Sequence, residues 1–118
     1  MLKASLISAA ALVMTSGLAL ADLAPVKEKD QFIGLVNGKT LSRPFIQLQV
    51  TPDGRISGTG GMRQVTGTWS WEAGYFCRDM KWGNRDIAYN CQEVRANGSE
   101  ITFTSDRGNG DSANFRIR

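Results

Sequence analysis

Histidine is absent from this chain of 118 residues. Without it the chain has no Ser/His or Cys/His pair for nucleophilic catalysis and no imidazole ligand for a metal ion. The acidic side chains that remain as candidates are Asp79, Asp86, Glu93, Asp106 and Asp111. Nothing in their spacing singles out two of them for acid and base work. We therefore expect no catalytic residues, no metal site and no cofactor, and we favour a non-catalytic protein.

Cysteine is scarce, because only Cys77 and Cys91 are present. They do not form a C-x-x-C motif, and no histidine is available to complete a zinc site. The spacing favours one disulfide that closes a loop of about 15 residues, which stabilises a small domain by roughly 3 kcal/mol in the chain-entropy model. The alternative is a pair of free thiols at a redox or metal site.

Long hydrophobic runs are missing everywhere except at the start of the chain. Lys3 precedes an apolar stretch from Ala4 to Leu18, and Ala19-Leu20-Ala21 has the small-x-small pattern of a cleavage site. We predict a signal peptide over residues 1–21 and a mature chain from Asp22, with an uncleaved anchor as the alternative. No cysteine follows the site for acylation, and no later run is long enough to span a bilayer. A periplasmic or secreted protein, with no stable membrane insertion after cleavage, is the expectation.

A strong charge of one sign is also lacking. The chain has 14 basic and 11 acidic side chains, and its nine arginines are spread evenly along the sequence. Nucleic-acid binding needs basic residues that cluster on one face or groove. We therefore expect no nucleic-acid partner.

Residues 22–118 are long enough for one domain, and turn signals divide them into short segments. One helix is expected over Gln31 to Val36, with Asp30 as its cap and Asn37-Gly38 after its end. Alternating patterns predict seven strands, over residues 45–50, 55–59, 62–71, 75–82, 87–95, 101–105 and 113–117. Residues 106–111 are expected to form a glycine-rich turn. The pattern indicates a mainly β fold: a small antiparallel meander barrel or sandwich, lipocalin-like or streptavidin-like.

The hairpin around Gly83-Asn84-Arg85 provides a test of register. If it centres on Asn84, Cys77 lies directly opposite Cys91, as a disulfide requires. The same register pairs Phe76 with Gln92, Arg78 with Asn90 and Met80 with Ala88.

One face of this hairpin is a candidate ligand site. An arginine with apolar neighbours on its own strand and amides across from it fits an anionic or carboxylate ligand, because a guanidinium donates two parallel hydrogen bonds. Trp69 and Trp71 share a strand face and can stack a flat or sugar-like ligand, although core packing is the simpler role. The candidate ligand-binding residues are Trp69, Trp71, Phe76, Arg78, Trp82, Asn90 and Gln92. Periodicity leaves open whether the Arg78 face lies inside the barrel or toward solvent.

Several motifs resemble a group of small exported proteins from marine and photosynthetic alphaproteobacteria, and together they cover most of the chain after residue 21. These motifs are Trp69-Ser70-Trp71, Gly74-Tyr75-Phe76-Cys77-Arg78-Asp79, Trp82-Gly83, Asn90-Cys91-Gln92, Phe103-Thr104-Ser105-Asp106-Arg107-Gly108 and Gly110-Asp111-Ser112-Ala113.

Members of that group often carry the label dihydrodipicolinate reductase. The residues argue against a nicotinamide-dependent enzyme, which needs a strand, a G-x-G-x-x-G turn and a helix. The nearest approach is Gly58-Thr59-Gly60-Gly61, where Arg63 stands in place of the third glycine and strand sequence follows.

Two functional hypotheses follow. The first is a periplasmic module that binds a small amphipathic or anionic ligand in a barrel pocket. The second is a protein–protein interaction module, such as an inhibitor or an envelope accessory, that has a filled core and uses its loops or a strand edge.

Overall fold

The computed structural model describes residues 22–118, so the predicted signal peptide and its cleavage site lie outside the described residues. Within that range, no helix is long and apolar enough to cross a membrane. The Cys77–Cys91 disulfide is formed, which fits an oxidising compartment outside the cytoplasm.

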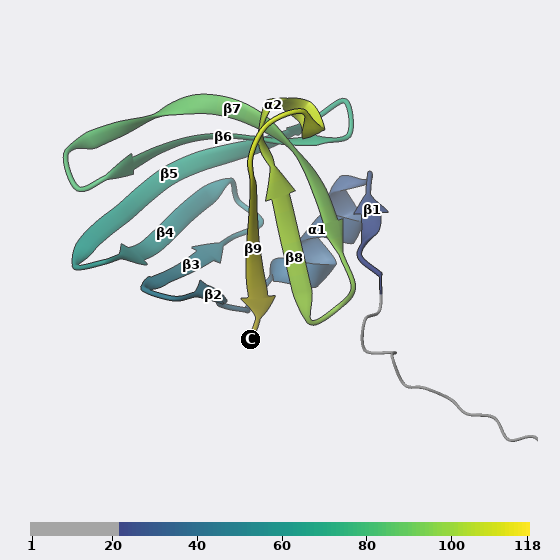
Figure 1. Ribbon diagram of the computed structural model, residues 1–118, viewed down its shortest axis with the longest axis horizontal. Helices are drawn as coiled ribbons and strands as arrows, with labels where there is room; N and C mark the ends of the chain where they lie inside the picture. Colours follow the sequence, from purple (N-terminus) through teal and green to yellow (C-terminus); the bar gives the residue numbers. More distant parts are fainter. Residues whose placement is uncertain (1–21) are drawn as a thin grey trace, which may run out of the picture.

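The fold is a closed antiparallel barrel of eight strands with one extra strand and two short helices (Figure 1). The barrel strands are β2 (Leu41–Arg43), β3 (Ile46–Val50), β4 (Arg55–Gly60), β5 (Arg63–Glu72), β6 (Tyr75–Trp82), β7 (Arg85–Ala96), β8 (Glu100–Thr104) and β9 (Ser112–Ile117). Pairing of β7 with β8 and of β9 with β2 closes the barrel. The extra strand β1 (Ala24–Val26) pairs with the second half of β7. The helices are α1 (Lys29–Val36) and α2 (Ser105–Gly108).

The meander is confirmed, with differences in its shortest elements. All seven predicted strands are present, and the structure adds β1 and β2, which the sequence does not predict because three residues carry almost no periodicity. The helix α1 begins at Lys29, two residues before the predicted start. Asp30 is therefore in its first turn and is not its cap; Glu28 occupies that position, without a side-chain capping bond. Residues 106–111 include most of α2, in which Asp106 and Arg107 have left-handed backbone angles.

The β6–β7 hairpin has the predicted disulfide register, but for a different reason. Trp82 pairs with Arg85, so the turn has only two residues and the hairpin does not centre on Asn84. A bulge in β7, where Ala88 and Tyr89 both lie opposite Asp79, then shifts the register by one residue.

The bulge also determines which residue of β7 pairs with Met80. Beyond it, Cys77 faces Cys91 and Arg78 faces Asn90, as expected. The predicted pairing of Met80 with Ala88 is wrong, because Met80 pairs with Ile87.

The helix α1 closes one end of the barrel through Phe32, whose side chain is 0% exposed. The Phe32 ring packs against a cluster of aromatic rings with centroids 5.0–6.3 Å away: Trp69, Trp71, Phe76 and Phe103. Phe32 and Val36 are one helical turn apart and both are buried, and Ile33 and Leu35 pack partly against the same core, so the helix closes the barrel with its apolar residues.

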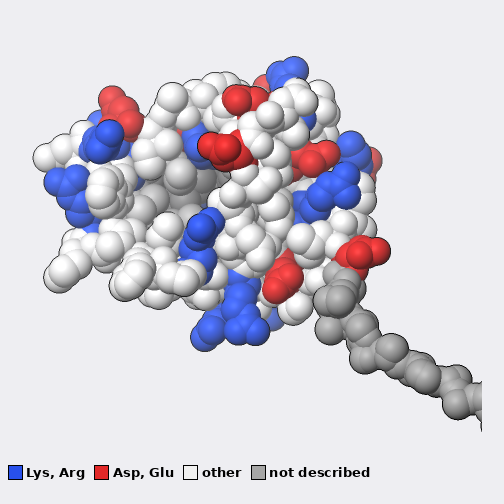
Figure 2. Space-filling model, in the orientation of Figure 1, with Lys and Arg blue, Asp and Glu red and all other residues white. Residues whose placement is uncertain are grey.

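The opposite end of the barrel is formed by three hairpin turns and lies at the left in Figure 1. These are the turns between β2 and β3, between β4 and β5, and between β6 and β7; we call them the open rim. Figure 2 shows that the surface is hollowed on this side of the molecule, between the β6–β7 hairpin and β9. One end of the barrel is thus filled by aromatic rings and the other is not.

Candidate ligand-binding cavity

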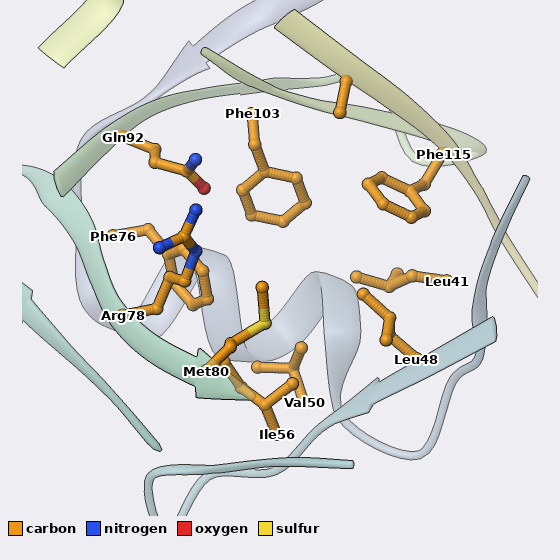
Figure 3. Close-up of a pocket in the computed structure, with 11 residues that line it drawn as sticks. Leu41, Leu48, Val50, Ile56, Phe76, Arg78, Met80, Gln92, Phe103 and Phe115 are labelled. Atoms are coloured by element: carbon orange, nitrogen blue, oxygen red, sulfur yellow. The ribbon is translucent and has the colours of Figure 1, made fainter. Parts of the chain in front are cut away.

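A cavity of about 140 Å³ lies in the middle of the barrel; we call it the inner cavity (Figure 3). Its wall is apolar except for Arg78 and Gln92. The apolar lining residues are Leu41, Leu48, Val50, Ile56, Phe76, Met80, Phe103, Ala113 and Phe115. A cavity of this volume is similar to engineered cavities that hold one benzene-sized group.

Arg78 points into the inner cavity, which answers the question that periodicity left open. Alternation along β6 places Phe76, Arg78 and Met80 on the inner face. Figure 3 shows the Arg78 guanidinium directed to the space between Gln92 and Phe103.

The Arg78 guanidinium is a charge in an apolar setting. Its Nη1 donates a hydrogen bond of 2.6 Å to the carbonyl oxygen of Ala88, in the β7 bulge. Burial lowers the pKa of Arg78, and the negative charge of Asp79 opposes this shift. None of the salt bridges among the described residues involves Arg78. Arg78 is thus a half-buried cation with unused donors, and no carboxylate lines the cavity beside it; the charge that acts on it comes from Asp79, its neighbour on β6.

The two amides predicted across from Arg78 hold the helix α2 in place. Gln92 is buried, and its Nε2 donates to Ser105 Oγ at 3.2 Å. Asn90 Nδ2 donates to Asp106 Oδ1 at 2.8 Å, while the Asp106 backbone N–H donates to Asn90 Oδ1 at 2.9 Å. Gln92 also lines the inner cavity, whereas Asn90 lies near α2 in a shallow surface hollow.

The three tryptophans are placed differently from one another. Trp69 and Trp71 pack around Phe32, and their indole N–H groups donate to the carbonyl oxygens of Thr51 and Lys27. Neither lines the inner cavity. Trp82 lies at the open rim, where its N–H donates to the Gly60 carbonyl oxygen at 2.7 Å. Of the seven candidate residues, the structure brings Phe76, Arg78 and Gln92 together around one cavity.

A second hollow of about 410 Å³ adjoins the inner cavity at the open rim; we call it the rim groove. Its lining is almost wholly apolar and includes Phe45, Val65, Trp82 and Ile87. Three side chains line both hollows: Leu48, Met80 and Phe115.

Met80 is the adaptable member of these three. Figure 3 shows its thioether projecting toward the centre of the inner cavity. A methionine side chain is unbranched and changes rotamer easily, so it can move aside for a ligand. An apolar path then leads from the open rim to Arg78.

Most of the cavity wall was not singled out from the sequence as site residues. The strands predicted over residues 45–50 and 113–117 do imply, by alternation, that Leu48 and Val50 share one face and that Ala113 and Phe115 share another. What alternation cannot provide is the distance between opposite walls of the barrel, and that distance separates a filled core from a cavity.

Comparison of the chain with models of protein families, with curated proteins and with solved structures found no match. The class is therefore defined by the structure itself: a small disulfide-linked β-barrel with one end closed by a helix and with an apolar cavity that contains one arginine.

Proposed function

We propose that this chain is an exported, non-catalytic binding protein that holds a small amphipathic anion inside its barrel. The anionic head, such as a carboxylate, binds Arg78, and the apolar tail extends past Met80 into the rim groove. The observation that carries the proposal is a guanidinium that forms no salt bridge and lies, with Gln92, in a wall that is apolar elsewhere.

Arg78 is half-buried, so its charge is partly desolvated without an ion-pair partner, which costs the fold some stability. A barrel that only needed a filled core would gain stability from an apolar side chain at position 78. The arginine is easier to understand as a binding group, because a guanidinium can donate two parallel hydrogen bonds to a carboxylate.

The length of the path indicates the size of the ligand. Arg78 and Trp82 are four residues apart on β6, which corresponds to about 13 Å along a strand. An alkyl carboxylate of medium length, such as octanoate, is somewhat shorter than this when extended and fits within the path. A free carboxylate or the anionic head of a related amphiphile supplies the same chemistry at Arg78.

The label dihydrodipicolinate reductase gains no support from the barrel. Every strand pairing within residues 22–118 is antiparallel. A dinucleotide site of the usual kind is instead built on a parallel βαβ unit.

Protein–protein interaction is the second candidate, and the edge of β7 favours it. From Arg85 to Tyr89, β7 pairs with β6 on one side only, because its pairing with β8 begins at Glu93 and α2 lies against Asn90 and Gln92. Such an edge can accept a strand from a partner protein. Pull-down of a specific partner that a proline at Ala88 abolishes, together with no ligand binding, is the result that this candidate predicts.

Calorimetric titration tests the primary proposal. The protein that accumulates after expression of the full chain is titrated with octanoate and with octanol at neutral pH, and native mass spectrometry identifies anything that co-purifies. We expect octanoate to bind and octanol to bind much more weakly.

Two variants show whether Arg78 carries the binding. Arg78→Met should lose about tenfold or more in octanoate affinity, since a hydrogen bond between charged groups contributes about 1.5–3 kcal/mol and Arg78 is half-buried. Arg55→Met, which removes an exposed arginine near the closed end, should bind normally. Equal affinity for octanoate and octanol, or normal binding by Arg78→Met, would contradict the proposal.

A further inference from the structure

Hydrogen bonds join the three turns of the open rim, so they do not behave as independent loops. The Gly61 backbone N–H donates to the Phe45 carbonyl oxygen at 2.7 Å, which joins the first turn to the second. Trp82 joins the third turn to the second through its bond to Gly60. The Gly83 backbone N–H donates to the Gln64 carbonyl oxygen at 2.7 Å. The side chains that project from these turns are thus held in a fixed arrangement.

Two large apolar side chains project from this rim into solvent. Phe45 is 83% exposed and Met62 is 100% exposed. Phe45 also has a backbone φ of 68°, which is unfavourable for a bulky side chain. Glycine or asparagine suits that position after a proline far better. A phenylalanine that is mostly exposed and has a strained backbone buries little of its ring against the barrel, so a role outside the fold is the better explanation.

Basic side chains surround these two apolar tips. Arg43, Arg63 and Arg85 flank the three turns, and all three residues are exposed. The acidic residue of the β6–β7 turn region is Asp86, which pairs with Lys81 at 3.6 Å. The corresponding end of Figure 2, at the left, shows white and blue atoms, with red confined to its upper corner. The rim therefore combines apolar tips with a net positive charge.

We propose that the open rim docks onto an anionic phospholipid bilayer. Phe45 and Met62 enter the boundary between head groups and acyl chains, while Arg43, Arg63 and Arg85 contact lipid phosphates. This inference goes beyond the ligand proposed above and does not depend on Arg78. It would place the rim groove directly against the membrane surface.

A lipid surface fits these features better than a protein partner does. A specific protein interface of standard size buries about 800 Å² on each partner in a continuous patch. The rim offers two isolated apolar tips with arginines between them, which is the pattern of shallow insertion into a charged interface.

Vesicle sedimentation tests the proposal on the protein that accumulates after expression of the full chain. The vesicles contain phosphatidylglycerol and phosphatidylcholine, or phosphatidylcholine alone. We expect binding to the anionic vesicles, much weaker binding to the neutral ones, and a decrease as salt is raised. Each arginine removed, as in Arg43→Gln or Arg85→Gln, should reduce the partition coefficient about fivefold.

The apolar tips are tested by Phe45→Gly and Met62→Gln. Each should reduce partitioning by up to about tenfold. Glycine relieves the strain at position 45, so the thermal midpoint of Phe45→Gly should stay the same or rise, which separates lost binding from lost folding. Matched controls are Tyr89→Ser, which removes an aromatic residue that is 56% exposed away from the rim, and Arg55→Gln.

Partitioning that the rim variants leave unchanged, or that Tyr89→Ser and Arg55→Gln reduce equally, would overturn the proposal. So would failure to bind anionic vesicles while a protein partner is bound through the same tips. Octanoate titration of the rim variants keeps the two proposals apart. Normal octanoate binding with no vesicle binding contradicts membrane docking alone, and the reverse result contradicts the ligand proposal alone.

Discussion

Replacement of Arg78 by methionine should remove ligand binding without harming the fold. The variant loses the hydrogen bond to the Ala88 carbonyl oxygen, but Ala88 is exposed and water can take the place of the guanidinium. We assign about 1 kcal/mol to this loss. In return, a half-buried charge leaves the cavity and an apolar side chain takes its place, which stabilises the fold by about 1–2 kcal/mol once solvent screening of the exposed half is allowed for. The free energy of unfolding should therefore stay the same or rise by about 1 kcal/mol.

Urea unfolding followed by tryptophan fluorescence measures this change, with Arg55→Met as the control. The direction of the Arg78 pKa shift also predicts how the difference in stability between the variant and the wild type depends on pH. Burial lowers the pKa of Arg78, so the charged form is the one that folding disfavours, and this penalty persists at every pH below the folded pKa. The difference between the variant and the wild type should hence be constant from about pH 5 to 9. If the free energy of unfolding of Arg78→Met falls by more than about 2 kcal/mol, the reasoning is refuted, because Arg78 then stabilises the β7 bulge instead of serving as a binding group.

Four further results are expected. Phe32→Ala should lower the free energy of unfolding by about 3–5 kcal/mol in urea titrations, since it empties the centre of the aromatic cluster; a small loss would mean that α1 does not close the barrel. Replacement of Cys77 and Cys91 by serine should cost about 3 kcal/mol by the same assay, and a stability equal to that of the wild type would contradict a structural role for the disulfide. Met80→Ala should cost about 1–2 kcal/mol, because Met80 is only partly buried, yet should increase calorimetric affinity for carboxylates longer than octanoate. Octanoate binding should weaken as the pH falls below about 5, where the carboxylate takes up a proton while Arg78 stays charged; binding that is unaffected by acid would point to an apolar ligand.

The strands and the disulfide could be predicted from the sequence because their signals are local. Alternation from Ile46 to Val50 and turn residues such as Gly83 define the meander, and two cysteines at this spacing have few other structural uses. The register of the β6–β7 hairpin is harder to predict from the sequence than its strands are. The correct pairing of Cys77 with Cys91 depends on a bulge that compensates for a shorter turn, and no sequence pattern announces such a bulge.

The cavity and the open rim could be predicted only in part. Phe76, Arg78 and Gln92 were candidates because they face one another across a hairpin, and that relation is also local. Whether they point inward depends on how the barrel closes, which involves β2 and β9, two strands that are far apart in the sequence. The sequence does not predict that Phe45 is exposed, for a similar reason. A phenylalanine next to a strand is normally expected in the core, and only the geometry of the turn shows that its side chain points outward.

The most direct test of the central claim is a crystal structure of the protein with octanoate bound. The account predicts the carboxylate within hydrogen-bond distance of the Arg78 guanidinium, with the alkyl chain passing a displaced Met80 toward Trp82. A carboxylate bound instead to the arginines of the open rim, with Arg78 still donating to Ala88 and Met80 unmoved, would contradict it.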